Sequence, residues 1–176
     1  MPGQGRATLD THYDLPSVDA DEDALQQDMS VFLALADQVS MGMTCHVIFE
    51  AVDAALPATI SPTVISETIR KRIGFEGLLM TDDLGMEALG GTLADRGAKA
   101  LEAGCDILLH CSGFLKEPVE ILSEMQIVAE TAGPLTDLAL SRAEAAEAAV
   151  QPAKIVDLEQ SWARFSELMS DTEARA

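Results

Sequence analysis

Basic residues are scarce in this sequence. Its 176 residues include 11 Lys and Arg against 30 Asp and Glu, which gives a formal net charge of -19 at pH 7. A surface with this excess of negative charge repels phosphate backbones and anionic lipid headgroups. We therefore expect neither a nucleic acid nor a membrane surface as a partner.

Aromatic residues and long apolar runs are also few. Aromatic residues make up 4% of the chain although hydrophobic residues make up 48%, so the core has to be built from Leu, Ile, Val, Ala and Met. The apolar runs near Leu78 and Ile107 are far too short to cross a bilayer. Residues 1–10 contain no apolar stretch of the kind that a secretion signal has. The sequence predicts a cytoplasmic globular protein.

The cysteines suit neither a disulfide framework nor a metal site. Three are present, and Cys45, Cys105 and Cys111 lie in or beside apolar stretches, which favours reduced, buried thiols. Two of them adjoin a histidine, but no Cys-x-x-Cys spacing accompanies them. The acidic residues 19–23 lack the glycine and the glutamate of a calcium loop. We expect no metal.

Strands and helices alternate along the chain. Apolar runs predict three strands, over Gly42–Phe49, Leu78–Asp82 and Cys105–His110. Helical spacing of apolar residues predicts helices over about 21–38, 61–73, 86–103 and much of 116–170. An aspartate at position 19 or 21, Ser61-Pro62 and Gly104 supply helix start and stop signals.

This alternation is typical of parallel βαβ units in an α/β fold. The spacing of about 30 residues between strands matches a barrel or a doubly wound sheet. Three strands cannot close a barrel, which needs eight. Gly3-Gln4-Gly5 comes closest to a dinucleotide-binding glycine motif, and no strand precedes it, so a dinucleotide fold has weak support.

Polar residues stand at the ends of the predicted strands, where parallel α/β folds bind ligands. Asp82 directly follows an apolar strand, so its carboxylate can project into a site from a rigid element and act as a nucleophile in glycosyl transfer. Asp82 or Asp83 can equally cap the next turn. The sequence leaves both readings open, and one residue of the pair can serve each. His110 stands at the end of the third strand.

The opening loop contains Arg6, Asp10 and His12. A carboxylate two residues from a histidine can orient the imidazole ring, which suits general acid/base chemistry. Solvated loop residues with no role are the alternative for this common spacing. His46, inside an apolar strand, fits either a core histidine with satisfied hydrogen bonds or a ligand contact.

Four parts of the chain carry motifs of one family, namely Pro2–Gly5 with Asp10–His12, Met43–Val47, Ile73–Met86 and Ala103–Leu109. In this order they resemble the Lys-His-Phe-Pro-Gly-His-Gly loop leading to Asp-Ser-His, the Met-Thr-Ala-His sixth strand, the nucleophile signature and the eighth strand of glycoside hydrolase family 3 β-N-acetylhexosaminidases. The likeness covers essentially the whole chain, and the signature around Asp82 is specific.

The resemblance implies the C-terminal half of a (β/α)₈ barrel, with about three parallel strands and their covering helices. Residues 1–176 would form a single partial catalytic domain. Within it, residues 1–18 would be the catalytic loop, 19–150 the half-barrel and 151–176 a C-terminal helix.

The resemblance also implies retaining hydrolysis of terminal non-reducing β-linked N-acetylglucosamine, with muropeptides of cell-wall recycling as typical cytoplasmic substrates. Asp82 would be the nucleophile, and His12, oriented by Asp10, the acid/base. His46 and Arg6 would contact the sugar. No cofactor is implied. Another family 3 activity, such as that of a β-glucosidase, is an alternative, although Asp10-Thr11-His12 argues for the hexosaminidase branch.

Two departures from the family pattern matter. Gln4 stands where the family usually has His, and the first half of the barrel, with the Lys-His pair that should precede Met1, is absent. Open strand edges and uncovered apolar faces favour self-association or partial folding, with weak activity. A non-catalytic half-barrel that self-associates is therefore a second alternative.

Overall fold

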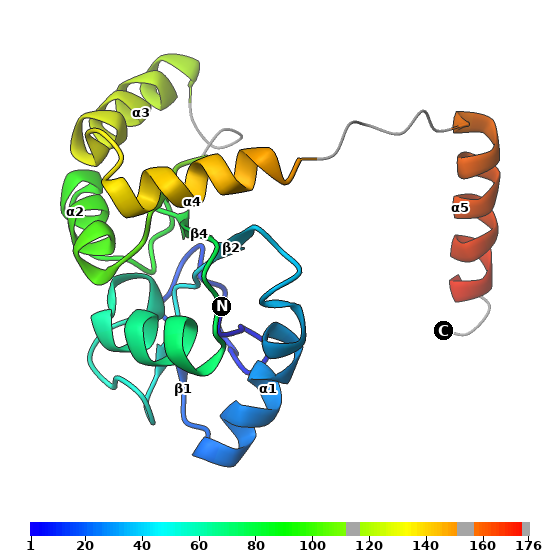
Figure 1. Ribbon diagram of the computed structural model, residues 1–176, viewed down its shortest axis with the longest axis horizontal. Helices are drawn as coiled ribbons and strands as arrows, with labels where there is room; N and C mark the ends of the chain where they lie inside the picture. The colour runs from blue at the N-terminus through cyan, green and yellow to red at the C-terminus, as the bar shows by residue number, and fades with distance from the viewer. Residues whose placement is uncertain (112–116, 151–156, 174–176) are drawn as a thin grey trace.

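The computed structural model describes residues 1–111, 117–150 and 157–173. A parallel three-stranded sheet forms the centre of the molecule (Figure 1), with β4 (Leu78–Asp83) between β2 (Met41–Met43) and β5 (Ile107–Leu109). Both outer strands pair with β4 in parallel. The prediction of an α/β fold with about three parallel strands is confirmed.

A second, two-stranded parallel sheet pairs β1 (Ser17–Val18) with β3 (Ile48–Phe49). The single strand expected over Gly42–Phe49 is therefore wrong, because this segment is divided between β2 and β3, which belong to different sheets. Backbone carbonyls between the two strands accept hydrogen bonds from Ala58 N and Thr59 N. These bonds replace the ladder to β4, so the chain leaves the central sheet.

Helix α1 (Glu22–Leu35) begins within the expected range. The Asp21 carboxylate accepts a hydrogen bond from Ala24 N at 2.9 Å and so satisfies one free amide of the first turn. The sequence left positions 19 and 21 open as the cap, and the structure selects Asp21.

Helix α2 (Leu93–Ala103) ends at Gly104 as predicted, with a φ of 112° that lies in the left-handed region favouring glycine. Its expected start at residue 86 is wrong. Thr92 Oγ1 accepts from Asp95 N while the Asp95 carboxylate accepts from Thr92 N, a reciprocal capping box that fixes the first turn later in the chain.

The remaining helical elements are η1 (Ala58–Ile60), the π-helix η2 (Val64–Arg72), α3 (Pro118–Ala132), α4 (Asp137–Ala148) and α5 (Leu158–Glu173). Helix α2 packs against α3 and η1, and α4 packs against β4. Helix α5 stands apart from these layers in Figure 1 and falls within the C-terminal segment expected to be helical. Residue 116 and the segments 151–156 and 174–176, also included in the helix predictions, lie outside the described residues. None of the described helices is long and apolar enough to cross a membrane.

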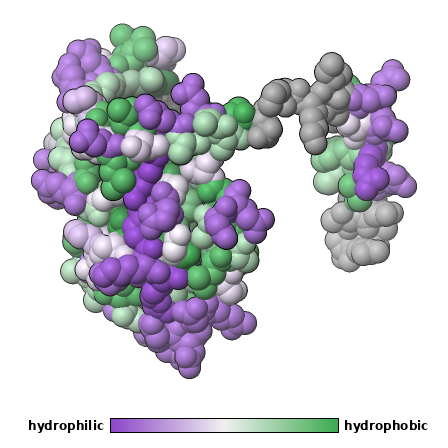
Figure 2. Space-filling model, in the orientation of Figure 1, coloured by the Kyte–Doolittle hydropathy of each residue, from purple (hydrophilic) through white to green (hydrophobic). Residues whose placement is uncertain are grey.

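The main core is aliphatic, as the scarcity of aromatic residues predicts. Val47, Ile69, Leu79 and the aromatic Phe75 are each 0% exposed within one cluster. Apolar side chains also reach the surface, and Figure 2 shows hydrophobic groups among hydrophilic ones on the face it presents. The edge strand β2 contributes to this apolar surface, since its two methionines are exposed.

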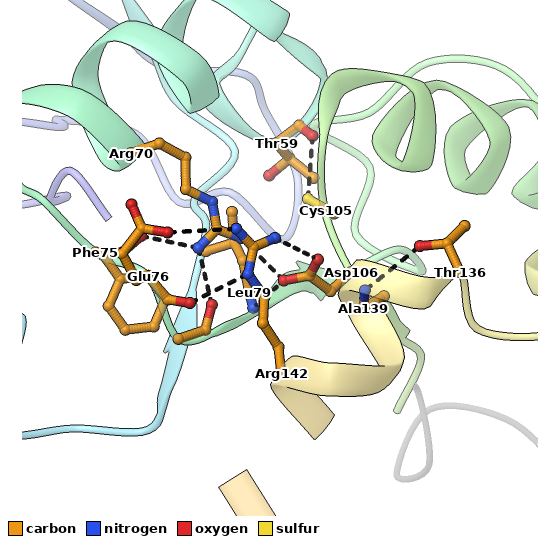
Figure 3. A network of polar contacts seen from close by, with 11 residues as sticks. Thr59, Arg70, Phe75, Glu76, Leu79, Cys105, Asp106, Thr136, Ala139 and Arg142 are labelled. Carbon is orange, nitrogen blue, oxygen red and sulfur yellow. Dashed lines mark hydrogen bonds and ion pairs between the residues drawn. The ribbon is translucent and has the colours of Figure 1, made fainter. Parts of the chain in front are cut away.

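Asp106 is the centre of a buried ion cluster next to β5 (Figure 3). Its Oδ2 accepts from Arg70 Nη2 at 2.9 Å, and its Oδ1 accepts from Arg142 Nη1 at 2.9 Å. Leu79 N also donates to Oδ2, at 2.8 Å. Asp106 precedes β5 and Leu79 is near the start of β4, so the cluster joins the amino ends of these strands, opposite the candidate site.

We expect Asp106→Asn to lower the free energy of unfolding by about 3–5 kcal/mol, because it removes the buried negative charge that two largely buried guanidinium groups share. The measurement is the urea unfolding curve at neutral pH. Glu67→Gln is the matched control, since it removes a carboxylate from the exposed Glu67–Lys71 pair and should leave the curve unchanged. Equal curves for the two variants would contradict a stabilising role for the cluster.

Candidate functional site

Strand β4 ends in two adjacent carboxylates with different surroundings. Asp82 is partly exposed and borders a cavity of about 420 Å³. Its Oδ1 accepts from Asp83 N at 2.9 Å, and its Oδ2 accepts from Gln4 Nε2 at 3.3 Å. No ion pair to Asp82 forms among the described residues. Its carboxylate therefore keeps free acceptor positions on the side of the cavity.

In Asp83, by contrast, one carboxylate oxygen contacts several donor groups. Oδ1 accepts from Gly85 N at 2.8 Å and from Cys111 N at 3.1 Å, and His110 Nδ1 lies 3.4 Å from the same oxygen. Burial acts to raise the pKa of Asp83, but these donors outweigh it and hold the pKa below its ordinary value. This arrangement favours Asp83 as the structural member of the pair and Asp82 as the reactive one.

His46 lies in the interior and is 0% exposed. Its Nε2 is 2.9 Å from the carbonyl oxygen of Asp83, which can only accept, so Nε2 carries a proton. Burial lowers the pKa of His46, and Nδ1 lies 2.8 Å from Thr59 Oγ1. Both ring nitrogens are engaged by protein, which favours a core histidine supporting the end of β4. Contact between His46 and a sugar stays a prediction.

Asp10 and His12 meet in the opening loop. His12 Nδ1 is 2.7 Å from Asp10 Oδ1, and His12 N donates to the same oxygen at 3.0 Å. These bonds lower the pKa of Asp10 and keep it ionised. The carbonyl oxygen of His12 accepts from Glu87 N at 3.2 Å, which ties the loop to the turn that follows β4. The His12 side chain is 57% exposed and so is open to a ligand.

Arg6 is paired with helix α1. Its Nε and Nη2 donate to the two carboxylate oxygens of Asp28, the second bond at 3.1 Å, and this pairing raises the pKa of Arg6. Both residues line a cavity of about 610 Å³ between the opening loop and α1. Asp82 lines the other cavity, so the structure does not bring Arg6 to it. Contact between Arg6 and a sugar stays a prediction.

His110 and Glu124 form a buried contact to which the sequence analysis gave no role. His110 Nε2 is 2.9 Å from Glu124 Oε2, which belongs to helix α3. The only signal in the sequence is a histidine at the end of an apolar run. Glu124 carries none, because an acid within a helix is usually a solvated surface residue.

The thiols have two kinds of surroundings. Cys45 and Cys105 are buried as expected, and burial raises the pKa of both, that of Cys105 to about 12. The expectation of burial is wrong for Cys111, which is exposed because it follows the end of β5. In the part of the chain that the structure describes, no group of three or more His, Cys, Asp and Glu side chains is arranged to hold a metal ion.

Comparison with curated proteins finds beta-hexosaminidases among the relatives of this chain. The beta-hexosaminidase of Alkalilimnicola ehrlichii is 42% identical over 116 residues, which cover 64% of this chain and 33% of that protein. The beta-hexosaminidase of Haemophilus influenzae is 37% identical over 117 residues, with the same shares of 64% and 33%. The chain thus spans about a third of the length of these relatives.

Solved structures extend the likeness to the fold. A glycoside hydrolase family 3 β-N-acetylglucosaminidase from Paenibacillus superposes with a TM-score of 0.69 at 25% identity, covering 89% of this chain and 32% of that one. NagZ from Neisseria gonorrhoeae, solved in complex with N-trifluoroacetyl-D-glucosamine, gives 0.60 at 30% identity, covering 86% and 45%. Residues 1–149 match the family described as glycosyl hydrolase family 3 N terminal domain. Since that match takes in the opening loop and all strands of both sheets, the chain belongs to glycosyl hydrolase family 3.

Proposed function

We propose that this chain contributes the catalytic residues for hydrolysis of terminal non-reducing β-linked N-acetylglucosamine with retention of configuration. The names of the related beta-hexosaminidases and β-N-acetylglucosaminidases support the substrate class. The observation that carries the proposal is the pairing of His12 with Asp10 on a loop whose Gln4 contacts the Asp82 carboxylate and whose His12 carbonyl oxygen is tied to the turn after β4. Cytoplasmic muropeptides are the natural substrates that we propose.

The first chemical step joins the sugar to the protein. A carboxylate oxygen of Asp82 bonds to the anomeric carbon as the bond from that carbon to the glycosidic oxygen breaks. His12 gives its proton to the departing oxygen, while the contact of Nδ1 with Asp10 keeps Nε2 available for this transfer. The products are a glycosyl ester of Asp82 and a free alcohol.

The second step releases the sugar. His12, now neutral, takes a proton from water, whose oxygen bonds to the anomeric carbon and displaces the Asp82 carboxylate. Two displacements at one carbon restore the original configuration. A histidine supported by a carboxylate thus takes the place of the second carboxylate found in most retaining glycosidases.

The test compares nitrophenyl N-acetyl-β-D-glucosaminide with nitrophenyl β-D-glucoside on the whole chain. We expect kcat/KM to be at least about 10²-fold higher for the first substrate. A site that hydrogen-bonds the acetamido group has polar groups that the glucoside, which lacks that group, leaves without a partner. A preference for the glucoside would favour another family 3 activity. The same sample is sized by gel filtration, and a folded oligomer with no turnover of either substrate would favour the self-associating half-barrel. The exposed methionines of edge strand β2 suit such an interface.

A further inference from the structure

The peptide unit of Asp83 is the immediate support of the Asp82 carboxylate. Asp83 N donates to Asp82 Oδ1 at 2.9 Å, and the Asp83 carbonyl oxygen accepts from the buried His46 at 2.9 Å. The direction of the Asp82 side chain therefore depends on where the Asp83 backbone is held.

The side chain of Asp83 also holds that backbone in place. Its Oδ1 accepts from the backbone of Gly85, in the next turn, and of Cys111, after β5. Asp83 is thus anchored to two segments, and its carboxylate is 14% exposed. A shift of this carboxylate would move the amide that holds Asp82.

Two titratable side chains contact this anchor among the described residues, the exposed thiol of Cys111 and the imidazole ring of His110. His110 is the one that also reaches another helix, through Glu124. The His110 side chain is buried, with 2% of it exposed, and it lies between two carboxylates. Nδ1 is 3.4 Å from Asp83 Oδ1, and Nε2 is 2.9 Å from Glu124 Oε2. Nδ1 is buried without a closer hydrogen-bond partner in the described part of the chain. A buried polar nitrogen costs free energy unless it is paired, and Asp83 is the group placed to pair it.

We propose that His110 is a positioning residue for Asp82, acting through the Asp83 carboxylate, an inference that rests on the proposed function. His110 ties the end of β4 to α3 through Glu124 and keeps Asp83 against the loop after β5. In the described part of the chain, His110 is not among the residues that line the cavity bordered by Asp82, so it acts on the attack rather than on sugar binding. Misplacing a reacting group by about 1 Å can cost about 10²-fold in rate.

Two isosteric variants separate the two contacts of the ring. Asn at position 110 places an amide nitrogen where Nδ1 faces Asp83, and Gln places one where Nε2 faces Glu124. We expect His110→Gln to lower kcat by about 10- to 100-fold with KM unchanged, and His110→Asn to keep kcat within a few-fold of the parent. A merely structural role would lower stability in both variants and leave kcat of the folded protein unchanged.

A second measurement follows the backbone amide of Asp83, which holds the Asp82 carboxylate, and it needs no catalytic turnover. Amide hydrogen exchange at Asp83 is compared with exchange at Leu79, a buried amide earlier in the same strand. We expect His110→Gln to speed exchange at Asp83 alone, and His110→Asn to leave both amides protected.

The outcomes separate this inference from the proposed function. Parent-like kcat and parent-like Asp83 exchange in His110→Gln would overturn the positioning role while leaving the proposed function intact. A parent protein without turnover would count against the proposed function, and the exchange comparison would then decide the positioning role by itself. Faster exchange at Asp83 only in His110→Gln would support it, and equal exchange in both variants would overturn it.

Discussion

Replacing Asp82 by Asn is expected to reduce kcat for an aryl N-acetyl-β-D-glucosaminide by about 10⁴-fold or more, because an amide cannot form the glycosyl ester. The fold should be unchanged. Asn keeps an Oδ1 to accept from Asp83 N, and the exposed Gln4 side chain can turn its carbonyl oxygen toward the new amide. The measurement is the initial rate at saturating substrate, with the unfolding curve recorded on the same sample.

Asp83→Asn is the matched control for this variant, since it makes the same change one residue later. It should cost stability, because a buried acceptor of two backbone amides loses its charge, and it should lower kcat much less than Asp82→Asn. If Asp82→Asn were as active as the parent, the nucleophile assignment would fail. A total loss in Asp83→Asn alone would exchange the roles of the two acids.

Local signals in the sequence predicted the order of elements because they act within a turn or two of the chain. Asp21 and Gly104 mark ends of α1 and α2 in the expected places. The start of α2 was misplaced for a related reason. Apolar spacing continues upstream of the helix, and the Thr92–Asp95 capping box decides where the backbone becomes helical.

The divided strand could not be predicted from its own residues. The segment from Gly42 to Phe49 has strand propensity throughout, but its middle carbonyl oxygens accept hydrogen bonds from amides of η1, which lies further along the chain. Strand propensity reports on packing against neighbours, and here the neighbours change halfway along the segment.

The candidate site, too, could be predicted only in part from the sequence. Sequence reasoning proposed Asp82, Asp10 and His12 as site residues from their types and places, but the residues alone could not separate Asp82 from Asp83. That separation comes from donors that the fold brings to Asp83 from beyond β5. Glu124 was out of reach altogether, since its contact with this cluster exists only once α3 packs beside β5.

The second large effect is expected at His12. His12→Ala should lower kcat/KM by about 10²- to 10⁴-fold for a methyl N-acetyl-β-D-glucosaminide, whose alkoxide leaves poorly without a proton. The same variant should lose far less on a dinitrophenyl glycoside, because that leaving group departs as a stable anion. The measurement is kcat/KM on both substrates, and equal losses would contradict the role of His12 as the acid.

The support of His12 by its neighbour gives a graded version of the same experiment. Asp10→Asn keeps an oxygen for the His12 backbone amide but removes the charge that faces Nδ1, so it should show the same leaving-group dependence with a smaller loss. Asp14→Asn is the control, since it removes one negative charge from the same loop. In the described structure the Asp14 side chain forms no hydrogen bond with His12, so this variant should leave both rates unchanged. A loss in Asp14→Asn equal to that in Asp10→Asn would mean that loop charge, rather than the orientation of the imidazole, controls the proton transfer.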